Sequence, residues 1–300
     1  MTAAPLPSLA RRAAALVALH ALVTGVMPGQ SAYLPQPGET TLTPLYSYQH
    51  TRDFYALGDR RITLSDPLEQ HTARVDLEHG FAPGWALDAA FGWSSVTYDE
   101  SSPPFLGVSL LGDGRTTREG LIDTRLGLRR LLSDEAASLS DWAPTLTARA
   151  GAIIAGTYET GFVNAVGDGA SGAELSLLAA KSFPASGTAI FADLTGRVFE
   201  GDVPDGFEAS TAVSQRVGDL VFTLGMRHQE SLDGPDILGP GFVTPRGLAF
   251  PAVREVNTTL EVGLSVPLGP VTLGLGYART LAGENTPRKA VYALSAAATF

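Results

Sequence analysis

Charged residues of both signs recur at alternate positions within short segments of this chain, and they are the residues best suited to do chemistry. They are Arg74, Asp76, Glu78, Asp88, Arg125, Arg129, Arg149, Glu174, Asp193, Arg197, Glu208, Arg216, Arg227 and Glu261. Guanidinium and carboxylate groups on one face can bond to each other, or they can line a passage for a solute. Two interpretations stay open: an ion-paired interior that only stabilises the fold, and the polar lining of a conduit.

The histidine at position 50 is the strongest candidate for catalysis. The segment Tyr48-Gln49-His50-Thr51 resembles lipolytic barrel enzymes of the phospholipase type, in which a serine nucleophile follows the histidine by two residues. Here that position holds Arg52, and Thr51 would point to the opposite face of a strand from His50. We therefore predict no catalytic residue and retain a lipid-modifying barrel enzyme as the alternative function.

The remaining residues predict no metal or cofactor site. His79 and His228 fall in the apolar register near strand ends, and no pair of histidines has the spacing of a zinc site. The acidic residues of the predicted loops match no calcium-loop spacing; they are Asp99, Glu100, Asp113, Asp233 and Asp236. The chain has no cysteine, and its net charge of −10 argues against a nucleic-acid partner.

Alternation with a period of two residues runs through most of the chain and predicts about 12 strands. The expected strands cover residues 39–49, 71–81, 85–98, 121–130, 145–154, 172–183, 188–199, 207–217, 220–229, 255–266, 271–280 and 290–300. In each strand, apolar side chains occupy one face and small, polar or charged side chains occupy the other. A basic side chain that faced lipid near the bilayer midplane would cost about 2–4 kcal/mol, so the charged face must point inward.

The connections between these strands alternate in length. Short links such as Ala82-Pro83-Gly84 and Gly218-Asp219 follow the even-numbered strands, with only Leu132 to Asp141 longer. Long links are expected at 50–70, 99–118, 155–170, 200–206, 230–252 and 281–288. This alternation, with only 17% charged residues, is typical of bacterial outer-membrane barrels. We predict an all-β fold: a transmembrane antiparallel β-barrel with both termini in the periplasm.

The two ends of the chain support export to the outer membrane. Residues 1–32 have the features of a signal peptide: Arg11 and Arg12, an apolar stretch from Ala13 to Met27, and a cleavage point near Ala32. Residues 33–300 then form a single barrel domain. The last strand ends in Phe300, which resembles the signal that barrel assembly machinery recognises.

Aromatic residues near the predicted strand ends suggest two girdles that set the depth of the barrel in outer-membrane lipid and lipopolysaccharide. They are Trp85, Trp93, Tyr98, Tyr158, Phe162, Tyr277, Tyr292 and Phe300.

Several short motifs resemble the MetA-pathway of phenol degradation family. They include Tyr33-Leu34-Pro35-Gln36-Pro37-Gly38-Glu39, Gly167 to Leu175, and Gly201-Asp202-Val203-Pro204-Asp205. Members of that family are regarded as outer-membrane transporters, often encoded near catabolic enzymes. The resemblance implies a channel-like barrel, but it implies neither a substrate nor a set of functional residues.

The expected function is passive diffusion of small, hydrophobic or aromatic molecules through the charged lumen. The loops 99–118 and 230–252 are expected to gate the mouth, and Leu238-Gly239-Pro240-Gly241-Phe242 is a candidate capture surface for an apolar ligand. A closed structural barrel is a further alternative.

Overall fold

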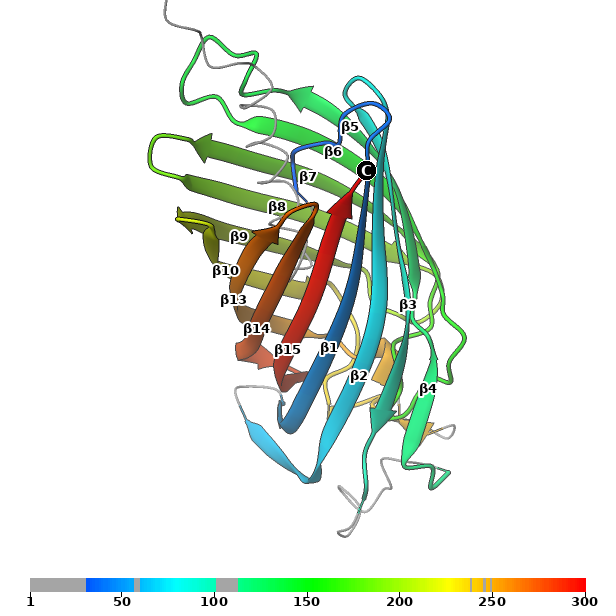
Figure 1. The fold of residues 1–300 in the computed structure, drawn as a ribbon. Coiled ribbons are helices and arrows are strands. Elements are labelled where there is room, and N and C mark those ends of the chain that lie inside the picture. Colours follow the sequence, from blue (N-terminus) through cyan, green and yellow to red (C-terminus); the bar gives the residue numbers. More distant parts are fainter. Residues whose placement is uncertain (1–30, 57–59, 101–112, 238, 245–246, 249) are drawn as a thin grey trace, which may run out of the picture.

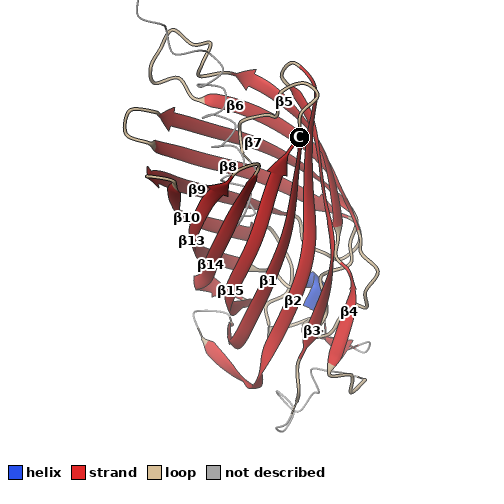
Figure 2. Ribbon diagram, viewed as in Figure 1, coloured by secondary structure: helices blue, strands red, loops and turns tan. Residues whose placement is uncertain are grey.

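The computed structural model describes residues 31–56, 60–100, 113–237, 239–244, 247–248 and 250–300, and these form an antiparallel β-barrel (Figure 1, Figure 2). The main strands are β1 (Thr40–Tyr55), β2 (Arg61–Ala82), β3 (Trp85–Thr97), β4 (Thr117–Leu121), β5 (Thr124–Ser133), β6 (Thr145–Ile154), β7 (Gly172–Phe183), β8 (Thr188–Phe199), β9 (Gly206–Val217), β10 (Leu220–Ser231), β13 (Val256–Leu268), β14 (Val271–Glu284) and β15 (Thr286–Thr299). A short hairpin of β11 (Val243–Thr244) and β12 (Gly247–Leu248) precedes a 3-10 turn at Phe250–Ala252.

The sheet closes on itself because the first strand pairs with the last one. Strand β1 pairs with β15 on one side and with β2 on the other, and β2 pairs in turn with β3. Strands β4 and β5 both pair with β3 and act as one interrupted strand, so the barrel has 12 strand positions. The predicted all-β antiparallel barrel is confirmed. In the part of the chain that the structure describes, no helix is long and apolar enough to cross a membrane.

Strand β7 shows how the sequence pattern becomes two faces. Leu175 and Leu177 are 66% and 48% exposed, whereas the adjacent Glu174 and Ser176 are buried. The other strands follow the same rule, with exposed Phe91, Leu126, Leu194, Leu224 and Leu275 on the outside. The barrel therefore presents an apolar exterior and encloses its polar residues, the arrangement that a lipid environment stabilises.

The barrel has a turn end and a loop end, and most of the links at the turn end are short. The turn end carries the C-terminus, the start of β1, and the short β2–β3, β7–β8, β9–β10 and β13–β14 links (Figure 1). The loop end carries the β1–β2, β6–β7, β10–β13 and β14–β15 links.

Two predicted loops at the loop end are largely strand. Strand β1 continues to Tyr55 and β2 starts at Arg61, because a register shift between Thr51 and Asp53 preserves the pairing beyond the expected end of the alternation. Strands β14 and β15 are separated by Asn285 alone, whose φ of 52° makes the turn. The expected loops 50–70 and 281–288 were therefore wrong. Most of the expected loop 99–118 lies outside the described residues, and its last two residues belong to β4.

Candidate functional site

A chain of alternating acidic and basic side chains crosses the inside of the barrel, and we call it the ionic belt. Its members are Asp88, Arg149, Glu174, Arg197, Glu208, Arg227 and Glu261, from strands β3, β6, β7, β8, β9, β10 and β13. All were predicted from the sequence to share the inward face. The structure brings them into one connected series of ion pairs.

Arg149 is the most enclosed member, with 1% of its surface exposed. Its Nε lies 3.0 Å from both carboxylate oxygens of Asp88, and its Nη2 lies 2.7 Å from Asp88 Oδ1. Its Nη1 donates a hydrogen bond to Glu174 Oε1. Arg149 therefore uses its forked donors to join two carboxylates that a neutral side chain would leave unpaired.

The contact between Arg149 and Asp88 requires a glycine on the strand between them. Gly127 of β5 aligns with Asp88 on β3 and with Gly151 on β6. A Cβ at Gly127 would lie 2.4 Å from Asp88 Oδ2 and 2.5 Å from Arg149 Nε. The absence of a side chain at position 127 lets the ion pair pass over β5.

The belt continues from Glu174 toward β13 with looser contacts. Arg197 Nε lies 3.3 Å from Glu174 Oε2, and Arg197 Nη1 lies 3.3 Å from Glu208 Oε2. Arg227 Nη1 is 3.7 Å from Glu208, and its Nη2 is 2.7 Å from Glu261.

The other charged residues predicted on the inward face lie beside the belt. Arg74 pairs with Asp76 at 2.7 Å, and Arg129, which is fully buried, lies 3.1 Å from Glu78. Arg125 is 3.8 Å from Glu174, and Asp193 accepts a hydrogen bond of 2.8 Å from Thr195. Arg216 lies near the turn end, half-buried, and forms no ion pair with any residue that the structure describes.

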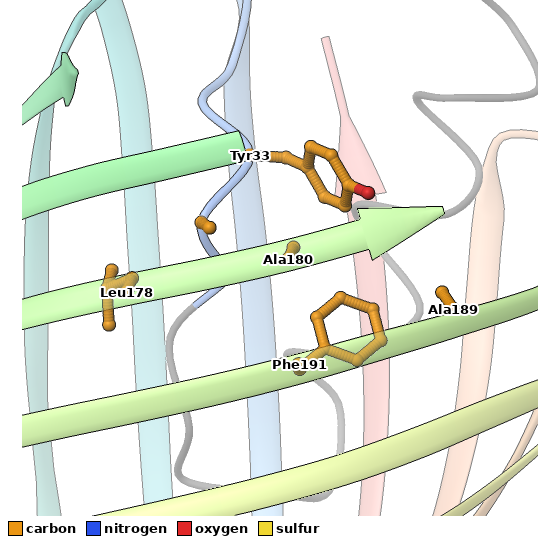
Figure 3. Close-up of a cluster of buried hydrophobic side chains, with 6 residues drawn as sticks. Tyr33, Leu178, Ala180, Ala189 and Phe191 are labelled. Atoms are coloured by element: carbon orange, nitrogen blue, oxygen red, sulfur yellow. The ribbon is translucent and has the colours of Figure 1, made fainter. Parts of the chain in front are cut away.

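The turn end of the barrel is closed by the segment that precedes β1, and sequence reasoning missed this. Ala32 and Tyr33 are 1% and 5% exposed, and the Tyr33 ring meets the ring of Phe191 edge-on at 6.4 Å (Figure 3). Ala180 and Ala189 complete the apolar contact from β7 and β8. The chain enters the barrel before it joins the sheet.

Polar contacts hold this segment in place. Tyr33 Oη donates a hydrogen bond of 2.7 Å to Glu135, which is itself 3.1 Å from Lys181 Nζ. Burial, together with that hydrogen bond, raises the pKa of the Tyr33 hydroxyl. Arg129 Nη2 donates to the backbone oxygen of Tyr33 at 3.3 Å. The segment then passes so close to β2 that a Cβ at Gly80 would lie 2.3 Å from the Gln36 backbone oxygen.

At the loop end, the β6–β7 link turns into the barrel mouth. Asn164 is fully buried: its Oδ1 accepts a hydrogen bond from Arg118 Nε at 3.1 Å, and its Nδ2 donates to the backbone oxygens of Arg115 and Thr116. The Phe162 ring stacks on the Arg118 guanidinium, 3.4 Å from Cζ. The link from 155 to 171 is therefore anchored over the barrel mouth, and no sequence pattern distinguished it from the other predicted loops.

An apolar cluster seals this cover against the wall of the barrel. It consists of Leu64, Leu68, Val96 and Tyr98, with Phe54, Val163, Val166 and Phe250 packed against it. Tyr98 was predicted in an aromatic girdle but is 2% exposed, because it shares the inward register of Val96. Tyr158 and Phe162 were likewise misplaced: Tyr158 Oη donates to Asp123, and Phe162 contacts Arg118. Trp93, Tyr292 and Phe300 are exposed as expected.

The β10–β13 link covers the mouth from the opposite side. Ile237 and Phe242 are buried, and the Phe242 ring meets Phe250 edge-on at 5.3 Å. Of the proposed capture segment 238–242, Leu238 lies outside the described residues. Phe242, its aromatic member, packs into the mouth instead of presenting a free surface.

A cavity of about 520 Å³ lies between the loop-end cover and the ionic belt. Phe54, Ile122, Phe162 and Phe250 are among the apolar residues that line it, and the belt side contributes guanidinium groups. The basic lining residues are Arg74, Arg125, Arg197 and Arg227. Acidic residues line it as well; they are Asp123, Asp168, Glu208, Glu230 and Glu255. The cavity is therefore amphipathic, with aromatic rings and charged groups of both signs.

One acidic residue of the cavity has a pKa above the ordinary range of a carboxyl group. Asp168, in the β6–β7 link, faces the cavity, and enclosure by the barrel raises its pKa to about 7. Glu255 and Asp123 raise it further through charge repulsion.

The histidine that could support catalysis lies on the outside of the barrel. His50 Nδ1 is 3.8 Å from Glu69, and both side chains are about two-fifths exposed. His79 and His228 bond to Thr40 and Thr258 at 2.9 and 3.1 Å. Within the described ranges, no group of histidine and acidic residues could hold a metal ion.

Solved structures with a similar fold are outer-membrane proteins. The chain aligns over 92% of its length with all of the COG4313 outer membrane channel from Pseudomonas putida F1, at 17% identity and a TM-score of 0.69. The KdgM porin and a TodX monoaromatic hydrocarbon channel align less closely, with TM-scores of 0.45 and 0.42 and identities of 9% and 10%. They cover 85% and 89% of this chain, and the matches span 99% and 90% of their own lengths. No known family model and no curated protein matches the chain, so the resemblance to the MetA-pathway family stays a prediction.

Replacing Arg149 by methionine should destabilise the barrel by about 3–5 kcal/mol, because Asp88 and Glu174 would remain buried without their shared cation. The free energy of unfolding in phospholipid vesicles, measured by denaturant titration, checks this. Arg216→Met is the matched control and should change stability little, since Arg216 is outside the network. Equal stability of the two variants would contradict the structural role of the belt.

Proposed function

We propose that this protein is an outer-membrane channel that admits small apolar or aromatic molecules. The observation that carries the proposal is the amphipathic cavity inside the barrel, which is lined by Phe54, Phe162 and Phe250 together with charged side chains of both signs. Apolar pockets with a few convergent polar groups are the common form of small-molecule sites. The fold shared with the COG4313 channel supports the proposal.

The proposed orientation follows from the predicted export signal. A signal peptide over residues 1–32, cleaved near Ala32, would deliver the chain to the periplasm. Assembly machinery would recognise the last strand with its terminal Phe300, and the turn end would face the periplasm. The loop end and its cavity would then open toward the outside of the cell.

In the proposed mechanism a solute moves down its concentration gradient through three zones. Aromatic rings of the mouth take up the apolar body of the solute, and the cavity holds it above the belt. The belt and the neighbouring charged residues predicted on the inward face would line the passage through the middle. The segment around Tyr33 is the last obstacle, and it must shift before the solute leaves at the turn end.

Transport accounts for these residues better than catalysis does. The candidate histidine, His50, lies outside the cavity, and the position of the expected nucleophile holds Arg52. A general base without a nucleophile in reach does not complete a hydrolytic site.

Aromatic solutes should interrupt the ion current of the refolded protein. Single-channel recordings in planar bilayers, with phenol or benzoate added at the loop side, should show concentration-dependent block because the rings occupy the cavity. The double variant Phe54→Ala, Phe250→Ala should weaken the block about tenfold, which corresponds to losing about 1.4 kcal/mol of binding.

Phe222→Ala is the matched control, because Phe222 is 46% exposed on the outer face. It should leave the block unchanged. A current that is insensitive to aromatic solutes, or equally sensitive in all three proteins, would refute the proposed cavity site.

Gly80→Val should increase single-channel conductance. A side chain at position 80 collides with the Gln36 backbone and should displace the segment that closes the turn end. A chain that begins at Gly38 provides a second test, since it lacks the closing segment altogether. Unchanged conductance in both proteins would show that the segment around Tyr33 does not limit the passage.

A further inference from the structure

Arginine side chains gather on the outer face of the barrel at its loop end, and we call this group the rim patch. It comprises His50 and Arg52 on β1, Arg61 on β2, Arg279 on β14 and Arg288 on β15. None of these residues lines the cavity. They belong to four neighbouring strands, because β15 pairs with both β14 and β1.

The strand register places a small side chain between two larger ones in this patch. Arg279 aligns with Ala290, and Ala290 aligns with His50 on the far side of β15. Adjacent strands are about 4.8 Å apart, so the Arg279 and His50 positions stand about 10 Å apart with a methyl group between them. A headgroup of modest size fits over Ala290 and can contact both neighbours.

The patch carries more positive charge than its own acids neutralise. Asp53 is shared by Arg61 and by Arg288, whose Nη1 lies 3.6 Å from it. Glu69 is 3.8 Å from His50 and accepts a hydrogen bond from Tyr48. Arg52 and Arg279 form no ion pair with any residue in the described ranges, although Arg279 has a side-chain hydrogen bond with Tyr277. No carboxylate of those ranges therefore neutralises either guanidinium group.

This surplus of cations contrasts with the rest of the protein. The whole chain has a net charge of −10. Elsewhere at the loop end, the strand-end residues Asp99, Glu119 and Glu230 contribute acidic side chains. Other arginines at this end, Arg115, Arg118 and Arg254, are each paired with carboxylates. The group of strands β14, β15, β1 and β2 differs in carrying arginines that no carboxylate of the described residues neutralises.

A row of aromatic rings fixes the depth of the patch. Tyr277, Tyr292, Tyr48 and His71 follow one another across the same strands, with centroid separations of 5.2, 6.4 and 5.0 Å. Tyrosine rings concentrate where the hydrocarbon of a membrane meets its headgroups. Arg279 and His50 lie two residues further along their strands, about 7 Å beyond the rings, at headgroup depth.

We propose that the rim patch binds the phosphate groups of a phosphorylated glycolipid, the lipid A part of lipopolysaccharide. Arginine binds phosphate oxygens through paired hydrogen bonds, and Arg52 and Arg279, which no described carboxylate neutralises, supply the donors. The acyl chains of the same lipid pack along the exposed apolar wall, which includes Tyr46 and Leu294. The inference relies on the proposed outer-membrane location and is independent of transport.

The test is a titration of the full-length, detergent-solubilised barrel with purified bis-phosphorylated lipid A. Native mass spectrometry measures the bound fraction. The double variant Arg52→Gln, Arg279→Gln should bind this lipid at least about tenfold more weakly, since each substitution removes charge-assisted hydrogen bonds. Arg130→Gln is the matched control: Arg130 is an exposed arginine on the outer face near the turn end, stacked on Trp85.

Lipid A without phosphates should bind the unmodified protein weakly, and phosphatidylglycerol should not replace the phosphorylated form. Equal binding by the double variant and Arg130→Gln would overturn the proposal, as would equal affinity for the dephosphorylated lipid or for phosphatidylglycerol. Retained heat-modifiability on a gel shows that the variants are folded. Conductance should be the same in the double variant, so loss of transport and loss of lipid binding are distinguished.

Discussion

Pairing of buried charges is the constraint on which the rest of this barrel depends. Because the outer face of the barrel is apolar, the polar residues of every strand face inward. An unpaired buried charge costs several kcal/mol there. The ionic belt offsets that cost because acidic and basic side chains alternate along it, from Asp88 to Glu261, and each charge has a partner of opposite sign. Because each side chain must reach a particular neighbour, the belt also favours one strand register over its alternatives. The belt also requires a glycine at position 127, because any larger residue would occupy the space in which Arg149 crosses β5.

The belt divides the interior into two regions with different chemistry. Toward the turn end, the remaining space is filled by the chain itself, with Tyr33 bonded to Glu135 and packed on Phe191. Toward the loop end, the inward-turned β6–β7 link leaves a cavity that aromatic rings share with arginines. A solute in that cavity would meet the arginines of the belt, Arg197 and Arg227, already paired with carboxylates. The same separation leaves the outer wall, with its tyrosine row and rim patch, to interact with the membrane.

The strands of the barrel could be predicted from the sequence because apolar and polar side chains alternate with a period of two residues. That alternation alone is enough to identify a strand with one apolar face. The prediction failed where that period is disturbed: the shift after Thr51 changes the register, and Asn285 makes a turn where a loop was expected. The charged residues of the belt could be assigned to one face, but their partners could not, because pairing depends on which strands are neighbours. The closing segment was missed for a similar reason. Tyr33 acquires its role only from Glu135 and Lys181, which are more than a hundred residues away in sequence.

The most direct measurement places single cysteines at neighbouring positions of β7, since the natural chain has none. Leu177 and Leu178 are the informative pair: they are the same residue type, yet they are 48% and 0% exposed. Each variant, Leu177→Cys and Leu178→Cys, carries a fluorophore in vesicles whose lipid chains bear a nitroxide quencher. If apolar side chains face lipid and polar side chains are enclosed, quenching should be strong at position 177 and weak at position 178. Equal quenching, or stronger quenching at position 178, would contradict this arrangement.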